Sequence, residues 1–136
     1  RGVTRRMPAR ASDPPSFRVL VLENDEGWHD VIRHVLQPPE FRLEVVSDYE
    51  EAKRALIDSL DLVIVNLSLH ARRRDFGGID LLRDLVGTGI PRLVLTGESS
   101  DTHNLFRRYS VSDVFIKGRT FDRERFRIRV KEVLSG

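Results

Sequence analysis

Five polar side chains in this sequence each follow a short apolar run, and their types suit contact with charged oxygen groups. They are Glu23, Asn24, Asn66, Thr96 and Lys117. Together they offer a carboxylate, two amides, a hydroxyl and an ammonium, which could hold an anion or close into an internal ion pair. A single carboxylate is a weak oxygen site for a divalent cation, and no general base with an evident partner accompanies it. The pattern therefore predicts no metal site, no cofactor and no enzymatic activity.

The apolar runs that precede these side chains have the length and composition of buried strands. They are FRVLVL (17–22), RLEVV (42–46), DLVIVN (61–66), PRLVLT (91–96) and DVFIK (113–117). Between these runs, apolar residues recur at helical spacing and predict five helices. The first ends near residue 37, the second begins after Asp48, the third covers 79–86, the fourth ends near residue 109 and the fifth covers 121–134. Residues 125–130 also alternate as a strand would, but the spacing of Phe126, Val130 and Val133 favours a helix.

Three helix starts are predicted from capping residues. Asp48 with Glu51 resembles a capping box, Ser99 or Ser100 would cap the fourth helix, and Thr120 the fifth.

Strands that alternate with helices predict an α/β fold, a doubly wound five-stranded parallel sheet with helices on both faces. In the flavodoxin-like strand order 2-1-3-4-5, groups at the carboxyl ends of the central strands converge on one edge of the sheet. The five polar side chains would then share a pocket. There we expect Lys117 to pair with Glu23 and to bond Asn66, because a buried charge needs a partner. Trp28 is interpreted as a packing residue.

Charge is unevenly distributed along the chain. Residues 1–16 carry four Arg and one Asp, residues 17–66 carry 5 Lys/Arg and 11 Asp/Glu, and residues 67–136 carry 14 and 9, so the three sums are +3, −6 and +5. We interpret 1–16 as a disordered basic leader and 17–136 as one domain. The absence of Cys fits a reducing cytoplasm, and no apolar run approaches the roughly 20 residues that cross a membrane.

The motifs VLVLENDE, DLVIVNLSL, PRLVLTGES and DVFIKG resemble, in their order and spacing, the strand-end motifs of response-regulator receiver domains of the CheY type. The resemblance covers about residues 17–134. It implies a phospho-accepting position at Asn66, an acidic-pair position at Glu23 and Asn24, and switch positions at Thr96, Val114 and Lys117. In the family, the acidic pair helps to hold a divalent metal, and the Thr and Lys contact the acyl phosphate.

Several of these positions depart from the family pattern. Asn66 and Asn24 replace acids, Val114 replaces the switch aromatic, and Gly118 stands where Pro is usual; the loop after Asn66 is longer and contains Arg72, Arg73 and Arg74. The resemblance, with these departures, implies a pseudo-receiver that acts in bacterial signalling without phosphorylation, through contacts with other proteins.

Arginines near the C-terminus form the predicted interface, which the resemblance places on the face of helix 4, strand 5 and helix 5. The candidate residues are Arg107, Arg108, Arg119, Arg123 and Arg127. The expected partner is a protein, with a homodimer through this face as one form. Two alternatives stay open: non-specific contact with nucleic-acid phosphates through the arginines, which we rank below a protein partner, and a small ligand in the degenerate pocket.

Overall fold

Five parallel strands form the centre of the computed structural model, in the order β2-β1-β3-β4-β5. The structure describes residues 16–67, 77–97 and 102–136. The strands are β1 (Phe17–Leu22), β2 (Phe41–Val46), β3 (Leu62–Leu67), β4 (Arg92–Thr96) and β5 (Asp113–Ile116). The predicted doubly wound α/β fold and its strand order are confirmed.

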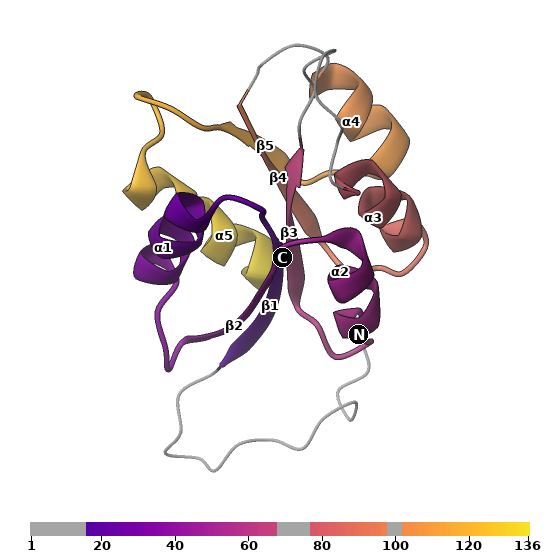
Figure 1. Ribbon diagram of the computed structural model, residues 1–136, viewed down its shortest axis with the longest axis horizontal. Coiled ribbons are helices and arrows are strands. Elements are labelled where there is room, and N and C mark those ends of the chain that lie inside the picture. Colours follow the sequence, from indigo (N-terminus) through magenta and orange to yellow (C-terminus); the bar gives the residue numbers. More distant parts are fainter. Residues whose placement is uncertain (1–15, 68–76, 98–101) are drawn as a thin grey trace.

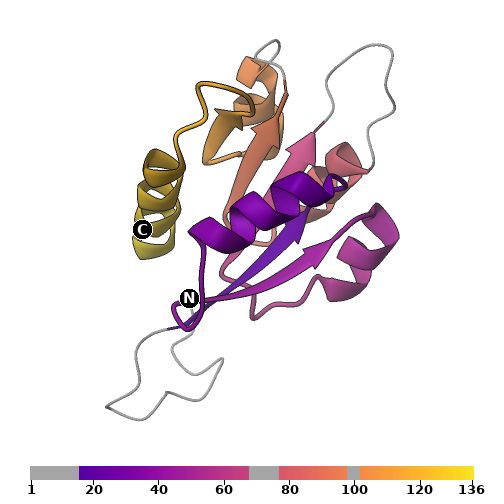
Figure 2. The ribbon, with the colours of Figure 1, turned by 60° about the vertical axis from the view of Figure 1, so that its left-hand side comes forward.

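Helices cover both faces of the sheet (Figures 1 and 2). α1 (Glu26–Val35) and α5 (Arg123–Ser135) lie on one face, while α2 (Tyr49–Ala55), α3 (Gly78–Leu85) and α4 (Thr102–Tyr109) lie on the other. Among the described residues, no helix combines the length and the apolar character that a membrane crossing requires.

The central strands are apolar throughout because both of their faces are covered. On β1 and β3, Leu20 and Val63 belong to the core cluster under α2, α3 and α4. Their neighbours Val21 and Ile64 belong to a second cluster under α1 and α5. Successive residues of a strand thus fill two separate cores, as the period of two requires.

Aspartates cap three of the helices. Asp25 accepts from the backbone N–H groups of Gly27 and Trp28 at the start of α1. Asp48 accepts from Glu51 N, which confirms it as the predicted cap of α2. The Glu51 carboxylate reaches back to Ser47 N, the residue before the cap, whereas in a standard capping box it would accept from the cap residue itself.

The predicted start of the last helix was wrong. Asp122, not Thr120, caps α5, and its carboxylate accepts from Glu124 N and Arg125 N. An Asp two residues later in the chain reaches the first free amides of the helix, so Thr120 stays in the turn before it. α5 runs to Ser135, which confirms the helical interpretation of residues 125–130. The predicted caps Ser99 and Ser100 lie outside the described residues.

β5 forms one edge of the sheet, and part of this edge is closed by the chain itself. The Val114 N–H donates to Oδ1 of Asp113 at 2.8 Å instead of to a further strand. The other carboxylate oxygen, Oδ2, accepts from Nε of Arg129 on α5 at 2.9 Å. Charged side chains on an edge strand are one means by which proteins prevent strand addition.

The strands end at similar levels, which brings their last side chains together. Leu22 of β1 lies opposite Val65 of β3, and Leu67 of β3 lies opposite Thr96 of β4. Thr96 in turn lies opposite Ile116, the residue before Lys117. The carboxyl edge of the sheet therefore gathers the residues that the sequence pattern singled out.

Candidate functional site

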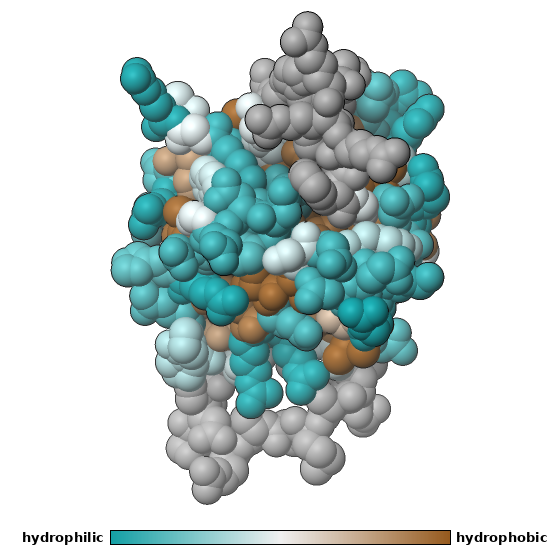
Figure 3. Space-filling view, viewed as in Figure 1, coloured by the Kyte–Doolittle hydropathy of each residue, from teal (hydrophilic) through white to brown (hydrophobic). Residues whose placement is uncertain are grey.

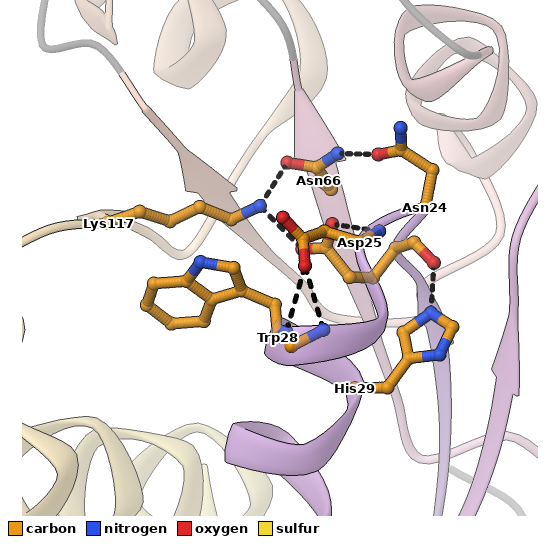
Figure 4. Close-up of polar contacts among 8 residues, drawn as sticks. Asn24, Asp25, Trp28, His29, Asn66 and Lys117 are labelled. Carbon is orange, nitrogen blue, oxygen red and sulfur yellow. Dashed lines mark hydrogen bonds and ion pairs between the residues drawn. The ribbon is translucent and has the colours of Figure 1, made fainter.

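The carboxyl edge of the sheet brings the five predicted side chains together on four neighbouring strand ends, and this polar cluster is called the pocket below. Glu23 and Thr96 have no exposed surface, whereas Asn66 is partly buried and Asn24 is exposed. The Lys117 side chain is 15% exposed. Figure 4 shows Lys117 reaching across from β5 toward β1 and β3.

A chain of polar contacts runs through the pocket. Lys117 Nζ lies 2.7 Å from Oε1 of Glu23 and donates to Oδ1 of Asn66 at 2.9 Å. The amide nitrogen of Asn66 donates to Oδ1 of Asn24 at 2.9 Å (Figure 4). The predicted contacts of Lys117 with Glu23 and Asn66 are therefore confirmed, and Asn66 has a partner on each side.

Glu23 is held on both of its carboxylate oxygens. Oε1 faces Lys117, and Oε2 accepts from the backbone N–H of Asp25 at 3.1 Å. The Glu23 carbonyl also contacts Nε2 of His29 on α1. Because a buried carboxylate is stable only when it is paired and hydrogen-bonded, these contacts explain how Glu23 can be fully buried.

Lys117 has a third neighbour that the sequence did not reveal. Its Nζ lies 5.2 Å from the centroid of the Trp28 ring, within cation–π distance. Trp28 in turn meets Phe121 edge-on, with ring centroids 4.9 Å apart and planes at 85°. Trp28 therefore packs, as predicted, but it packs against the cation of the pocket. The position of Trp28 in the first turn of a helix that follows β1 is the only sequence signal for this contact.

The two remaining switch positions are Thr96, the last residue of β4, and Val114 in β5. Thr96 is buried, and its carbonyl accepts from the Lys117 backbone N–H at 2.8 Å. Val114 is partly buried and packs against the core cluster beneath α2, α3 and α4. Because residue 114 is a valine, this position has no aromatic ring that could swing between two positions, and its β-branched side chain has few rotamers.

The backbone after Lys117 follows a path that only glycine adopts readily. Gly118 has φ of +124°, and no heavy atom lies within 4 Å of the place where its Cβ would be. Proline, the residue that receivers usually have here, fixes φ near −65° and is incompatible with this conformation. The departure at Gly118 thus belongs to a different local backbone.

The chemistry available in the pocket is limited by its side-chain types. Asn66 presents an uncharged amide where a nucleophilic carboxylate would have to stand. The Glu23 and Lys117 charges cancel, so the pocket has little net attraction for a divalent cation. Within 16–67, 77–97 and 102–136, no group of three or more His, Cys, Asp or Glu side chains could hold a metal ion. The arrangement is that of a self-neutralised polar network.

The predicted interface arginines fall into two groups. Arg107 and Arg108 are exposed on α4, and Arg119 is exposed in the loop between β5 and α5. Arg123 and Arg127 instead line a groove of about 530 Å³ between α5 and the end of α1. Helical spacing explains the division, because residues 123 and 127 share one side of α5. Arg72, Arg73 and Arg74 lie outside the described residues.

Glu40 joins the α1 side of α5 to the loop before β2. Its carboxylate lies 3.1 Å from Arg127 and 2.9 Å from Lys131. The hydrogen bond from Lys131, with the added charge of Arg127, holds the pKa of Glu40 below its ordinary value. Arg127 is therefore already engaged within the chain.

Arg107, Arg108 and Arg119 have no such engagement. None of the three forms an ion pair with another residue in the described part of the chain, and all three side chains are exposed. These three residues, called the arginine surface below, remain available for an outside partner.

Comparison with known proteins places this architecture among receiver domains. The chain is similar to the non-phosphorylated HemR receiver domain from Leptospira biflexa, at 25% identity and a TM-score of 0.72 over 88% of this chain and 95% of that one. It is similar to a CheY-like response regulator receiver domain protein from Methanospirillum hungatei JF-1, at 16% identity and a TM-score of 0.71 over 88% and 94%. A response regulator receiver protein from Burkholderia phymatum matches at 20% identity and a TM-score of 0.71 over 88% and 95%.

The sequence alone matches no protein-family model and no curated protein. The fold is nevertheless that of a response-regulator receiver domain, and it supports a role in response-regulator signalling.

Proposed function

We propose that this receiver domain works in bacterial signal transduction without phosphorylation at position 66, by binding a protein partner. The observation that carries the proposal is the double engagement of the Asn66 amide, by Asn24 on one side and by Lys117 on the other. The module has no enzymatic activity of its own in this proposal. In this proposal it resides in the cytoplasm, because a chain without Cys has no disulfide that would need an oxidising compartment.

The charge state of the pocket supports the loss of phosphoryl chemistry. Transfer to a receiver needs a carboxylate nucleophile and a cation that screens the phosphoryl charge. Here the amide at Asn66 cannot serve as that nucleophile, and Lys117 is already paired with Glu23. Asn24 adds a neutral amide where a second acid would attract the metal.

Intact-mass spectrometry after incubation with acetyl phosphate and Mg²⁺ tests this half of the proposal. We expect the wild-type chain to gain no phosphoryl group. The double variant Asn24→Asp/Asn66→Asp, which restores both acids, is the matched comparison, and Asn104→Asp on α4 controls for the added charge. A stable phosphoryl group on an aspartate of the wild-type chain would contradict the proposal.

The exposed side chains of α4 support a protein partner. Phe106 is 41% exposed and stands next to Arg107 and Arg108 in the sequence. Aromatic and arginine side chains are enriched at protein–protein interfaces, where the planar guanidinium makes paired contacts with carboxylates. The Val114 N–H already donates to Asp113 and is not free to pair with an added strand. A partner on this side would therefore be bound mainly through side chains.

A second copy of the chain is the first partner to test. Sedimentation over a range of protein concentrations should show a dimer that Arg107→Glu/Arg108→Glu weakens, whereas Arg33→Glu, exposed on α1, leaves it intact. A wild-type chain that stays monomeric at every concentration would exclude the homodimer.

The arginine surface also makes nucleic acid a second candidate partner, since Arg107, Arg108 and Arg119 have no carboxylate partner in the described residues. Such binding would be non-specific and would weaken steeply with salt. Absence of a mobility shift at low salt would exclude it.

A further inference from the structure

We propose that Trp28 couples the polar pocket to the loop between β5 and α5, which carries Arg119. The Lys117 ammonium lies over the Trp28 ring (Figure 4). Phe121, which lies in that loop, packs edge-to-face with the same ring. The coupling gives the module a means of regulation through its pocket, and in this it rests on the proposed function.

The first link joins the pocket cation to α1. Lys117 Nζ is shared among the Glu23 carboxylate, the Asn66 amide oxygen and the Trp28 ring, at 2.7 Å, 2.9 Å and 5.2 Å. A lysine has one ammonium on a flexible stem, so a stronger attraction to one neighbour draws it from the others. A change in charge at position 66 would therefore change the contact with Trp28.

The second link joins α1 to the loop. Phe121, four residues after Lys117, packs edge-to-face with Trp28 and also contacts Phe126 of α5, with the Phe121 and Phe126 centroids 5.4 Å apart. Phe126 is fully buried, so this end of the aromatic series is anchored in the core. The loop between Lys117 and Phe121 contains Gly118, at a φ of +124° that glycine adopts without the steric cost of a Cβ.

The aromatic residues Trp28, Phe121 and Phe126 lie on a different face of the sheet from Val114, the family's switch position. Val114 is seated in the core on the other face of the sheet, under α2, α3 and α4. Trp28, Phe121 and Phe126 lie on the α1–α5 face instead. A signal from the pocket would in this chain leave through α1 and the β5–α5 loop.

Figure 3 shows one face of the molecule, on which hydrophilic side chains surround smaller groups of apolar ones.

Amide hydrogen exchange of residues 119–124 tests the coupling, in the full chain with EDTA and without a phosphoryl donor. Asn66→Asp is the perturbation, because it places an anion beside Lys117 yet is distant from the loop in sequence. Loss of a cation–π contact should speed exchange in the loop by about two- to fivefold. Asn104→Asp, exposed on α4, should leave that exchange unchanged.

Trp28→Leu supplies the decisive background. If Trp28 is the link, Asn66→Asp speeds exchange of 119–124 in the wild-type background and has no further effect in the Trp28→Leu background. The coupling is overturned if Asn66→Asp leaves exchange unchanged, or if it has the same effect with and without Trp28.

Because the chain has one Trp, its fluorescence reports the contact between Lys117 and Trp28 separately. Asn66→Asp should change the emission intensity, and an unchanged emission would contradict that link. No partner is needed for these measurements, so their outcome is independent of whether the proposed protein binding is right.

Discussion

Lys117 Nζ lies 2.7 Å from Oε1 of Glu23, and the Glu23 side chain has no exposed surface. The pair places two opposite charges at the carboxyl edge of the sheet, and each is the only charged partner of the other that the described residues show. Its energetic role follows from burial, because a charge removed from water is costly when its partner is lost.

Removal of Lys117 should therefore destabilise the fold strongly. We expect Lys117→Met to lower the free energy of unfolding by roughly 3–5 kcal/mol, because Glu23 would remain buried without its partner. Lys131→Met removes a lysine whose side chain is 44% exposed from its pair with Glu40, which is 33% exposed, and should cost about 0–1 kcal/mol. Urea unfolding of the two variants measures the difference. Glu23→Gln in the Lys117→Met background should recover part of the loss; if it adds a further full penalty, the pair is not the cause.

Restoring two acids should make stability depend on magnesium. Asn24→Asp/Asn66→Asp adds two carboxylates beside Glu23, and hard oxygen ligands of this kind attract Mg²⁺. At a Mg²⁺ concentration ten times the Kd, the stabilisation would be about 1.4 kcal/mol. Thermal unfolding with Mg²⁺ and with EDTA should differ for this variant and coincide for the wild-type chain. A magnesium-dependent wild type would show that the existing side chains already hold a metal.

Gly118 and Gly97 form a matched pair for testing backbone strain. Neither has a heavy atom within 4 Å of the place where its Cβ would lie, but only Gly118 has a positive φ, of +124°. We expect Gly118→Ala to destabilise by about 1–3 kcal/mol from conformational strain alone. Gly97→Ala should change stability by far less. Equal effects in denaturant unfolding would mean that strain at Gly118 is unimportant.

The Glu40 carboxylate should titrate at lower pH than an ordinary glutamate. Hydrogen bonding by Lys131 is the main cause of its lowered pKa, and Lys131→Met should raise that pKa toward the ordinary value. Because the folded-state pKa is depressed, this contribution to stability is present above the unfolded-state pKa. It is lost as the pH falls through the folded-state pKa. Carboxyl NMR titration checks the pKa, and unfolding at several pH values checks the linkage. If the difference in unfolding free energy between the wild type and Lys131→Met persisted below the folded-state pKa of Glu40, this linkage would be contradicted.

Much of the fold and part of the site could be predicted from the sequence. Apolar runs that end in Glu23, Asn66, Thr96 and Lys117 predict both the sheet and the meeting of these side chains, since parallel strands end at a common edge. The start of α5 could not be placed correctly, because Thr120 and Asp122 are both good capping residues. Only the path of the loop decides which of them reaches the first amides.

Contacts that depend on three-dimensional packing were beyond the sequence. The distance between Lys117 and Trp28 depends on the orientation of α1 relative to the sheet, and the spacing of apolar residues carries no information about that orientation. Arg127 was assigned to the same face as Arg107, yet in the structure it pairs with Glu40. The interface itself remains a prediction.

The carboxylate of Asp113 has a consequence for the behaviour of the protein at high concentration. It occupies the Val114 amide while Arg129 holds it in place, so β5, one of the two edge strands, offers a poorer template for another chain at this point. Chains with an open, flat outer strand can recruit one another without limit and form fibres. Replacing Asp113 would remove that protection, so this residue should matter most when the protein is crowded, as in overexpression or long storage.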